Sequence, residues 1–313
     1  MNYNIYKEIV LFQTPRILGL GDRNESSKTF GCFDRYYWHY KLLDISNARF
    51  QESSFLLALL YCNNFDSNIF YKNQSLFKWA EGGIKYWAEI QRKNGSFDEV
   101  YPFENSFVAT AFSTCAITES MLAMNTECCL ENVVKAGKWL SRNDNFIVAN
   151  QMAGALLALY NIFLLTEDER FLMAANDKLK NLLALQTIEG FFPEYGGYDI
   201  GYLSITISYM AAYYKKTQKQ NIYDSIIRAI DFIEGKIQDD GSHDYTQTSR
   251  GTQYLYPYGF TVMNRINVLE KQLNGLEKNS IINPSWMDDR FCIPLTIDYL
   301  QTYLEIPNEN DNT

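Results

Sequence analysis

Apolar residues recur at helical spacing along most of the chain, whereas the strict alternation typical of strands is scarce. Ten segments are predicted to be helices: 49–64, 75–93, 106–124, 130–142, 150–165, 169–186, 201–217, 220–238, 259–273 and 292–305. Residues 1–48 are expected to be an N-terminal lead-in segment and residues 306–313 a flexible C-terminal tail. The pattern therefore predicts an all-α protein, with residues 1–313 forming one domain.

A short motif recurs at the ends of the predicted helices. It is clearest in "IQRKNGSFDE" (90–99), "LQTIEGFFPE" (185–194) and "IQDDGSHDY" (237–245), and a degenerate copy is "LSRNDNF" (140–146). Each clear copy has a Gln near the end of a helix, then a Gly, then aromatic and acidic residues. A Gly after the last periodic residue is a helix-stop signal. The step of roughly 45–50 residues corresponds to one helix hairpin.

A chain of helix hairpins predicts an (α/α) toroid, a barrel of about 10–12 helices. In such a barrel every connection from an outer to an inner helix lies on the same face. These connections are the long, polar and aromatic ones, at 94–105, 143–149, 187–200, 239–258 and 280–291. The sequence therefore predicts a single face decorated with long loops.

Composition narrows the classes of partner. The formal net charge is −9 and no basic tract occurs, which argues against nucleic acid and anionic membrane surfaces as partners. No secretory signal and no apolar run of about 18 residues is visible, and the six cysteines indicate reduced thiols, so we expect a cytoplasmic protein without a transmembrane segment. The 23 tyrosines and 20 phenylalanines suit a surface that stacks on sugar rings, although Tyr can equally replace Leu in a core.

The hairpin repeat and its Q-x3-G-[SF]-F pattern resemble the (α/α) toroid enzymes. These include heparinase II/III-like polysaccharide lyases, uronyl C5-epimerases, several glycoside hydrolases and terpenoid cyclases. The blocks "FGCFDRYYWHYKLLDISNARFQE" (30–52), "EYGGYDIGYLS" (194–204) and "SRGTQYLYPYGF" (249–260) also resemble uncharacterised proteins of polysaccharide-biosynthesis gene clusters. The resemblance implies a carbohydrate-active toroid in which Tyr, His, Arg and Asn share the catalytic work.

Chemistry on a uronate needs a cation for the sugar carboxylate and a Tyr or His as base and acid. The predicted catalytic residues are His39, His243, Tyr245, Arg250 and Tyr254. The predicted substrate-binding residues are Arg35, Trp38, Glu99, Glu194, Tyr198, Asp199, Tyr256 and Tyr258. In a closed ring the first and last hairpins meet, so that residues 30–50 face residues 239–258. The leading hypothesis is an enzyme that acts on an acidic polysaccharide or oligosaccharide by β-elimination or C5 epimerisation.

Several alternatives stay open. A glycoside hydrolase would pair Asp98 or Glu99 with Glu194 or Asp199 as acid and base. A non-catalytic glycan-binding or assembly protein would keep only the aromatic cleft. Acids at helix starts are often N-caps, and each histidine can equally serve a structural role. A terpenoid cyclase is disfavoured, because the sequence contains neither a DxDD nor a DDxxD motif.

Metal and cofactor sites receive little support from the sequence. The chain has two histidines and no CxxC pair, so we expect no cofactor and no His/Cys zinc site. A calcium ion held by loop carboxylates is the alternative left open. The expected partner is an acidic glycan.

Overall fold

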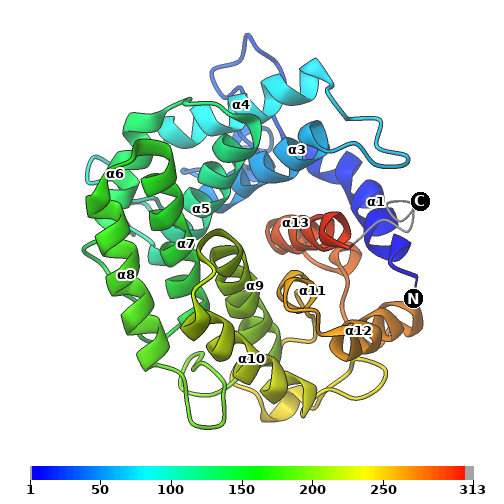
Figure 1. Ribbon diagram of the computed structural model, residues 1–313. Helices are drawn as coiled ribbons and strands as arrows, with labels where there is room; N and C mark the ends of the chain where they lie inside the picture. The colour runs from blue at the N-terminus through cyan, green and yellow to red at the C-terminus, as the bar shows by residue number, and fades with distance from the viewer. Residues whose placement is uncertain (1, 307–313) are drawn as a thin grey trace. The chain divides into compact units, whose positions relative to one another are not determined.

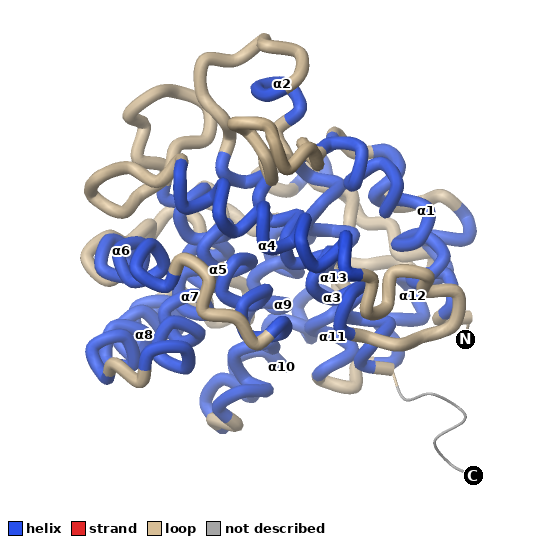
Figure 2. Tube along the Cα trace, turned by 90° about the horizontal axis from the view of Figure 1, so that it is seen from above, coloured by secondary structure: helices blue, strands red, loops and turns tan. Residues whose placement is uncertain are grey.

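The computed structural model describes residues 2–306, and these residues form helices and connecting loops without a named strand (Figures 1 and 2). The first half contains α1 (Asn4–Leu20), α2 (Arg35–Trp38), the 3-10 helix η1 (Ala48–Glu52), α3 (Ser53–Cys62), α4 (Gln74–Glu89), α5 (Phe107–Met124) and α6 (Leu130–Leu140). The second half contains α7 (Ala149–Thr166), α8 (Glu169–Ala184), α9 (Ile200–Thr217), α10 (Gln220–Glu234), η2 (Tyr245–Gln247), α11 (Tyr258–Val262), α12 (Ile266–Lys278), η3 (Pro284–Trp286) and α13 (Asp289–Glu305). The all-α prediction is confirmed.

The structure adds two features to the predicted helices. Helix α1 lies in the stretch predicted only as a lead-in, and it buries Tyr6, Val10 and Ile17 along one side. The predicted helix 259–273 is divided into α11 and α12, because Asn264 takes a left-handed conformation with φ 54°. The predicted flexible tail falls largely on residues 307–313, which lie outside the described residues.

The contacts group the chain into two compact units. Unit 2 contains Leu11–Asp144 and Gly154–Lys178, and unit 1 contains the residues up to Val10, Asn145–Ala153 and the residues from Leu179 onward. In unit 2, α3 packs against α4 and α5, and α5 packs against α6. In unit 1, α9 packs against α10 and α11, and α11 packs against α13. The expectation of one domain stays a prediction.

Buried and half-buried helices alternate along the chain. Helices α5 and α9 are buried on nearly all sides, whereas α4, α6, α10 and α12 bury one face each. This alternation is what a repeat of helix hairpins requires, since each hairpin has one core helix and one helix that faces solvent.

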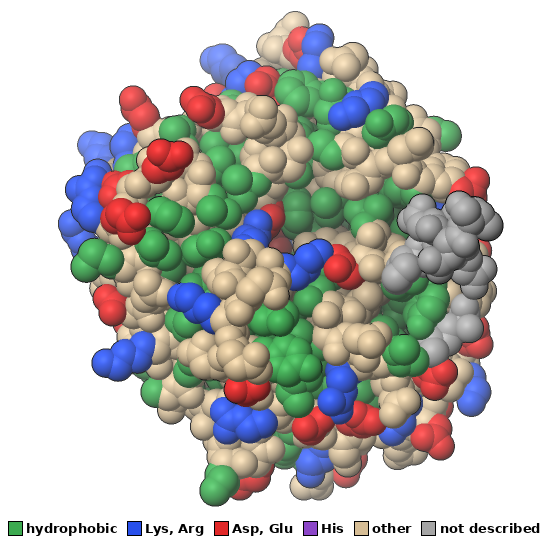
Figure 3. Space-filling view, viewed as in Figure 1, with side chains coloured by type: hydrophobic (Ala, Val, Ile, Leu, Met, Phe, Trp, Pro, Cys, Tyr) green, Lys and Arg blue, Asp and Glu red, His purple; other side chains and the backbone are tan. Residues whose placement is uncertain are grey.

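Helices α5 and α7 are long and apolar enough to cross a membrane by length and composition alone. However, 67% of the apolar stretch in α5 and 72% of that in α7 are buried inside the protein. Burial of this kind is expected of core helices. On the face shown in Figure 3, acidic and basic side chains are interspersed over most of the surface, and several basic side chains lie together at the left edge.

The predicted repeat is visible as three turns with the same hydrogen bonds. The backbone N–H of Arg92, Thr187 and Gln238 donates to the carbonyl four residues later, at 2.9, 2.9 and 2.8 Å. The glycine three residues after each donor has positive φ, and a Cβ atom at that position would meet a carbonyl of the following half-buried helix. These glycines and carbonyls are Gly95 with Lys135, Gly190 with Arg228, and Gly241 with Lys271.

The hydrogen bonds also correct the predicted alignment of the glutamines. Gln91 and Gln186 occupy the same position, and each donates from Nε2 to a carbonyl of the following helix, at 2.8 and 2.9 Å. Gln238 stands one residue later, so that Ile237 takes the glutamine position in the third copy. In the corrected register, His243 is equivalent to the fully buried Phe97 and Phe192.

The degenerate copy at 140–146 lacks the glycine, and a lysine from α8 packs against this turn. Lys178 on α8 is buried, and its ammonium donates to the carbonyls of Leu140 and Asn143 at 2.9 and 2.6 Å. It also pairs with Asp144. The side chain thus satisfies carbonyl groups at the end of α6, where the other copies pack backbone against a glycine.

Candidate functional site

Two loops of unit 1 meet at residues Glu194–Asp199 and His243–Thr252, which we call the loop junction. Ser249 connects the two loops twice. Its backbone N–H donates to the carbonyl of Tyr198 at 2.9 Å, and its hydroxyl donates to the carbonyl of Glu194 at 2.5 Å. Long loops of unit 1 that are far apart in the sequence are therefore brought together, as the repeat predicts.

The carboxylate of Asp199 accepts hydrogen bonds from both sides of the loop junction. It is the N-cap of α9 and accepts a hydrogen bond from the N–H of Tyr202 at 3.0 Å. The same carboxylate accepts hydrogen bonds from the Thr252 N–H at 3.2 Å, the Thr248 hydroxyl at 3.1 Å and the Thr252 hydroxyl. The N-cap alternative for Asp199 is thus realised, and its predicted role in substrate binding stays a prediction.

Glu194 is a second buried carboxyl of the loop junction. It has no exposed surface, and its carboxyl accepts hydrogen bonds from the Asn150 N–H at 2.9 Å, the Asn150 amide at 3.0 Å and the Thr206 hydroxyl at 3.2 Å. Burial raises the pKa of Glu194 to about 8, and the negative charge of Asp199 adds to the shift. This raised pKa favours the protonated form of Glu194 at neutral pH, which is the form that a general acid requires.

Arg250 is held by aromatic rings. Its guanidinium lies 4.5 Å from the centroid of the Tyr195 ring and 5.9 Å from that of Tyr202, and the two rings are 6.4 Å apart. Arg250 is exposed and forms no ion pair within the described part of the chain. A guanidinium that is oriented by stacking and lacks an acidic partner is suited to a ligand carboxylate.

Tyr195, on which Arg250 stacks, has an unfavourable left-handed backbone conformation. Tyr195 has φ 55° and Gly196 has φ 86°, and the left-handed conformation costs a non-glycine residue about 1 kcal/mol. The turn is held by hydrogen bonds from the Glu194 N–H to the Gly197 carbonyl at 2.7 Å and from the Tyr195 N–H to the Ile147 carbonyl at 3.0 Å. It leaves the Tyr195 side chain 46% exposed.

His243 is a buried histidine with a fixed tautomer. The side chain is 8% exposed, and Nε2 lies 2.8 Å from the carbonyl oxygen of Thr252. Because a carbonyl only accepts, Nε2 carries the hydrogen, and Nδ1 is the acceptor of the neutral ring. Nδ1 is closed off from solvent and has no partner. Burial lowers the pKa of His243, which favours this neutral form.

Two cavities adjoin His243. The larger has a volume of about 180 Å³ and is lined by Tyr198, Ile200, Lys236, His243, Asp244 and Gln247. At about 30 Å³ for each water, it has room for roughly six waters or one sugar ring. The smaller, of about 50 Å³, is lined by residues that include His243 and Tyr245. Lys236 contributes an ammonium that lies 5.3 Å from the Tyr198 ring centroid.

The three remaining tyrosines predicted for this site are largely buried. Tyr254 and Tyr256 pack ring to ring, with centroids 5.8 Å apart. The N–H of Tyr256 donates to the Ser204 hydroxyl at 3.0 Å, and the N–H of Tyr258 donates to Asp298 at 2.9 Å. These residues connect the loop to α9 and α13, and their roles in catalysis or substrate binding stay predictions.

The other predicted site residues lie in unit 2. Arg35 stacks on Trp38 at 5.8 Å and donates to the Gly19 carbonyl, and the Trp38 indole donates to the Leu20 carbonyl at 2.7 Å. His39 is exposed beside Trp38. The predicted meeting of His39 and His243 stays a prediction, since the two residues belong to different units.

Glu99 also lies in unit 2, in the loop that follows the first copy of the motif. Its carboxylate is 3.5 Å from the hydroxyl of Ser106, the N-cap of α5. In that loop, Asp98 pairs with Arg92, and Glu104 accepts hydrogen bonds from three successive backbone N–H groups. The acids beside Glu99 therefore stabilise the loop.

The sequence analysis did not select Tyr195, Tyr202, Lys236 or Thr252. Tyr195 and Tyr202 stand seven residues apart in "EYGGYDIGY", and the paired glycines between them were the available signal for a turn that presents an aromatic ring. The contact of Tyr195 with Arg250 joins residues that are far apart in the sequence. A local sequence pattern cannot predict a contact between residues so far apart.

Comparison with known proteins gives a likeness to solved structures but none to a family model or a curated protein. Among solved structures, a variant of the type II terpene cyclase MstE from Scytonema, in its apo form, matches with a TM-score of 0.51 and 10% identity, over 97% of this chain and 98% of that chain. This likeness supports the fold alone, and the fold class is all-α, of the (α/α) toroid type.

Proposed function

We propose that this chain is an enzyme that acts on a uronate-containing saccharide by removing the proton next to the sugar carboxylate, followed by β-elimination or C5 epimerisation. The observation that carries the proposal is Arg250, an exposed guanidinium held over Tyr195 and Tyr202 without an acidic partner within the described residues. A carboxylate is one of the planar oxyanions that a stacked guanidinium binds through two parallel hydrogen bonds.

The loop junction supplies a role for each step. Arg250 would bind the uronate carboxylate and stabilise the negative charge that develops when C5–H is broken. His243, neutral and with Nδ1 as its free acceptor, would take that proton. In the elimination, the electron pair forms the C4–C5 double bond, the C4–O bond breaks, and the Tyr245 hydroxyl protonates the leaving oxygen.

Access to the base sets one requirement on this mechanism. Nδ1 of His243 is closed off in the free protein, so the loop 243–252 has to shift when the saccharide binds. Tyr245 is 43% exposed and lines the small cavity together with His243, and it lies in the part of the loop that would move. In an epimerisation the proton would return to C5 from the opposite side.

A panel of uronate polymers and oligosaccharides tests the proposal. β-Elimination gives an unsaturated product that absorbs in the near ultraviolet, and epimerisation gives exchange of the C5 hydrogen with deuterated solvent. Arg250→Ala is expected to reduce turnover by about 10²–10³-fold, because it removes the donor to the developing charge, and Arg250→Lys is expected to recover part of it. His243→Phe is expected to abolish turnover and still fold, because phenylalanine occupies the equivalent position of the other two turns.

Lys278→Ala is the matched control, since Lys278 is an exposed cation of unit 1 at the end of α12. Turnover that is unchanged in both Arg250→Ala and His243→Phe would refute the assignment of the site. Binding of glycans without any turnover, lost in Tyr195→Ala, would instead support a non-catalytic glycan-binding protein.

A glycoside hydrolase is the second candidate, and the proton held by Glu194 favours it. The raised pKa of Glu194 suits the acid of a two-carboxyl mechanism, and Asp199 is the candidate for the second carboxyl. Release of reducing ends without an unsaturated product, abolished in Glu194→Gln, would select this reading. Terpene cyclisation, the activity named for the structural neighbour, is not proposed, since the sequence lacks both aspartate motifs.

Under this proposal the protein acts in the cytoplasm on an acidic glycan and needs no cofactor. A calcium ion in the loops stays the alternative. Within the described residues, no group of three or more His, Cys, Asp and Glu side chains is placed to hold a metal ion.

A further inference from the structure

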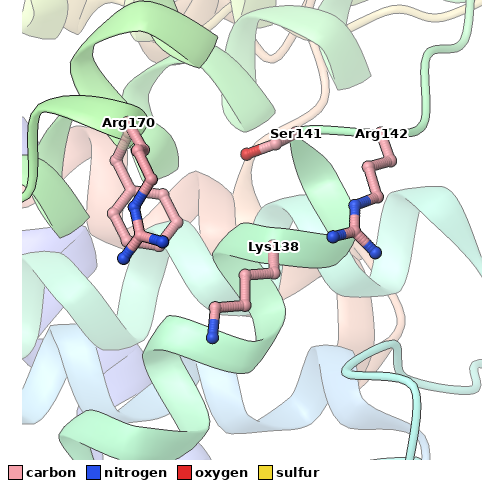
Figure 4. A pocket seen from close by; sticks show the side chains of 5 residues that line it. Lys138, Ser141, Arg142 and Arg170 are labelled. Carbon is pink, nitrogen blue, oxygen red and sulfur yellow. The ribbon is translucent and has the colours of Figure 1, made fainter.

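Unit 2 carries a shallow cavity between α6 and α8, with a volume of about 180 Å³ (Figure 4). It is lined by Lys138, Ser141, Arg142, Arg170 and Phe171. Three of these five side chains are cations, in a chain whose formal net charge is −9. These cations lie in unit 2, away from the residues assigned to the proposed activity in unit 1.

The floor of the cavity is apolar and depends on a glycine. Phe171 is 3% exposed and packs against Gly137 of α6. A Cβ atom at Gly137 would lie 2.7 Å from Cε1 of Phe171 and 2.8 Å from Cδ1 of Ile162. The glycine therefore permits the close approach of α6 and α8, and the cations lie around the edge of the buried ring.

The cations are only partly neutralised. Arg170 binds Asp168 through Nε at 2.9 Å and through its terminal nitrogen at 2.6 Å. Lys138 and Arg142 are exposed, and neither side chain forms an ion pair with a described residue. Three cations and one carboxylate leave an excess of two positive charges at the cavity.

Other side chains already satisfy the carbonyl groups at the C-terminal end of α6, so Lys138 and Arg142 are not required for that structural role. Lysine and arginine often compensate the carbonyl groups at a helix C-terminus. Here the Ser141 hydroxyl donates to the Gly137 carbonyl at 2.7 Å, the Asn143 amide to that of Trp139 at 2.7 Å, and Lys178 to that of Leu140 at 2.9 Å. Lys138 and Arg142 are thus not needed as caps for these carbonyls.

We propose that this cavity binds a phosphate or sulfate ester group of a larger ligand. Lys138 and Arg142 would pair with the oxyanion above the apolar floor that Phe171 forms. An oxyanion matches the guanidinium fork and the ammonium, and the cavity of about 180 Å³ has room for the ester group, with the rest of the ligand outside it. The proposal does not depend on the activity assigned to unit 1.

Isothermal titration of the full chain at low ionic strength tests this site. The probes are inorganic phosphate, inorganic sulfate, glucose 6-phosphate and glucose 6-sulfate. Arg142→Ala and Lys138→Ala are each expected to weaken binding on the order of tenfold, because each removes a charge-assisted contact. Lys135→Ala is the matched control, an exposed lysine of α6 that does not line the cavity, and it is expected to leave affinity unchanged.

A gain of affinity provides the sharpest check. Asp168→Asn keeps the oxygen that accepts the Arg170 N–H at 3.0 Å but removes the charge that engages the guanidinium. It is expected to tighten binding several-fold, and added salt is expected to weaken it. Stronger binding of glucose 6-phosphate or of glucose 6-sulfate would identify the ester.

The proposal is overturned if none of the four probes binds. It is also overturned if Arg142→Ala and Lys138→Ala bind as tightly as Lys135→Ala. Since the unit 1 residues Arg250 and His243 are untouched in all these variants, a failure here is distinguishable from a failure of the proposed function.

Discussion

Glu194 illustrates how burial changes the chemistry of a single side chain. The carboxyl has no exposed surface and accepts hydrogen bonds from Asn150 and Thr206, but burial outweighs these bonds and raises its pKa to about 8. The folded chain therefore binds a proton that the unfolded chain releases above about pH 4.5.

This difference makes stability fall as pH rises. Because the pKa is raised on folding, the stabilisation is fully present below the unfolded pKa and is lost as pH increases toward the folded value. Between about pH 5 and pH 8 the loss of unfolding free energy from Glu194 is expected to be on the order of 3 kcal/mol. Urea unfolding at several pH values measures it, with Glu194→Gln as the comparison.

Glu194→Gln is expected to flatten this slope, and Asp298, whose pKa burial raises to about 7, would supply the remaining fall over the same range. An equally steep slope in the variant would show that Glu194 is ionised in the folded protein. That result would also remove the basis for Glu194 as an acid.

At the scale of elements, the repeated turn explains how a sequence motif becomes a packing device. Each turn uses a glycine at positive φ to place loop backbone against a carbonyl of the next helix. The side chain two residues after that glycine is buried. It is Phe97 in the first turn, Phe192 in the second and His243 in the third. A histidine in a phenylalanine position is a local departure from the repeat, and such departures are expected where function requires them.

Gly190 and Gly196 both have positive φ, but only Gly190 is closely packed, so substituting each one distinguishes the effect of packing from that of backbone strain. A Cβ atom at Gly190, with φ 104°, would lie 2.5 Å from the Arg228 carbonyl oxygen, whereas at Gly196, with φ 86°, it would meet nothing within 4 Å. Gly190→Ala is expected to cost about 2–4 kcal/mol of unfolding free energy, and Gly196→Ala about 1 kcal/mol. Equal losses in thermal or urea unfolding would contradict the packing role of the turn.

The sequence predicted the helices well and their interruptions poorly. Periodicity located the hairpin helices because each buries at least one face. It did not reveal α1, where Pro15 and Gly19 interrupt the helical signal, or the break at Asn264, where a left-handed residue separates α11 from α12. These features depend on backbone conformation and tertiary packing, which outweigh local propensity.

At the scale of the whole molecule, the sequence predicted the fold class and the residue types of the candidate site but not their pairings. Arg250, His243 and Glu194 were selected from their loops. The stacking of Arg250 on Tyr195, the bond of His243 to Thr252 and the four donors around Asp199 are contacts of the folded loops. The predicted pairing of His39 with His243 would join the two units, and it stays a prediction.

The central claim is that Arg250, set between Tyr195 and Tyr202, recognises a sugar carboxylate. The most direct measurement compares the binding of glucuronate and glucose, which differ at C6, to the wild type and to Arg250→Ala by titration. The account predicts that glucuronate binds the wild type at least about tenfold more tightly than glucose, and that Arg250→Ala removes the difference. Equal affinity of the wild type for the two sugars, or a preference that survives in Arg250→Ala, would contradict it.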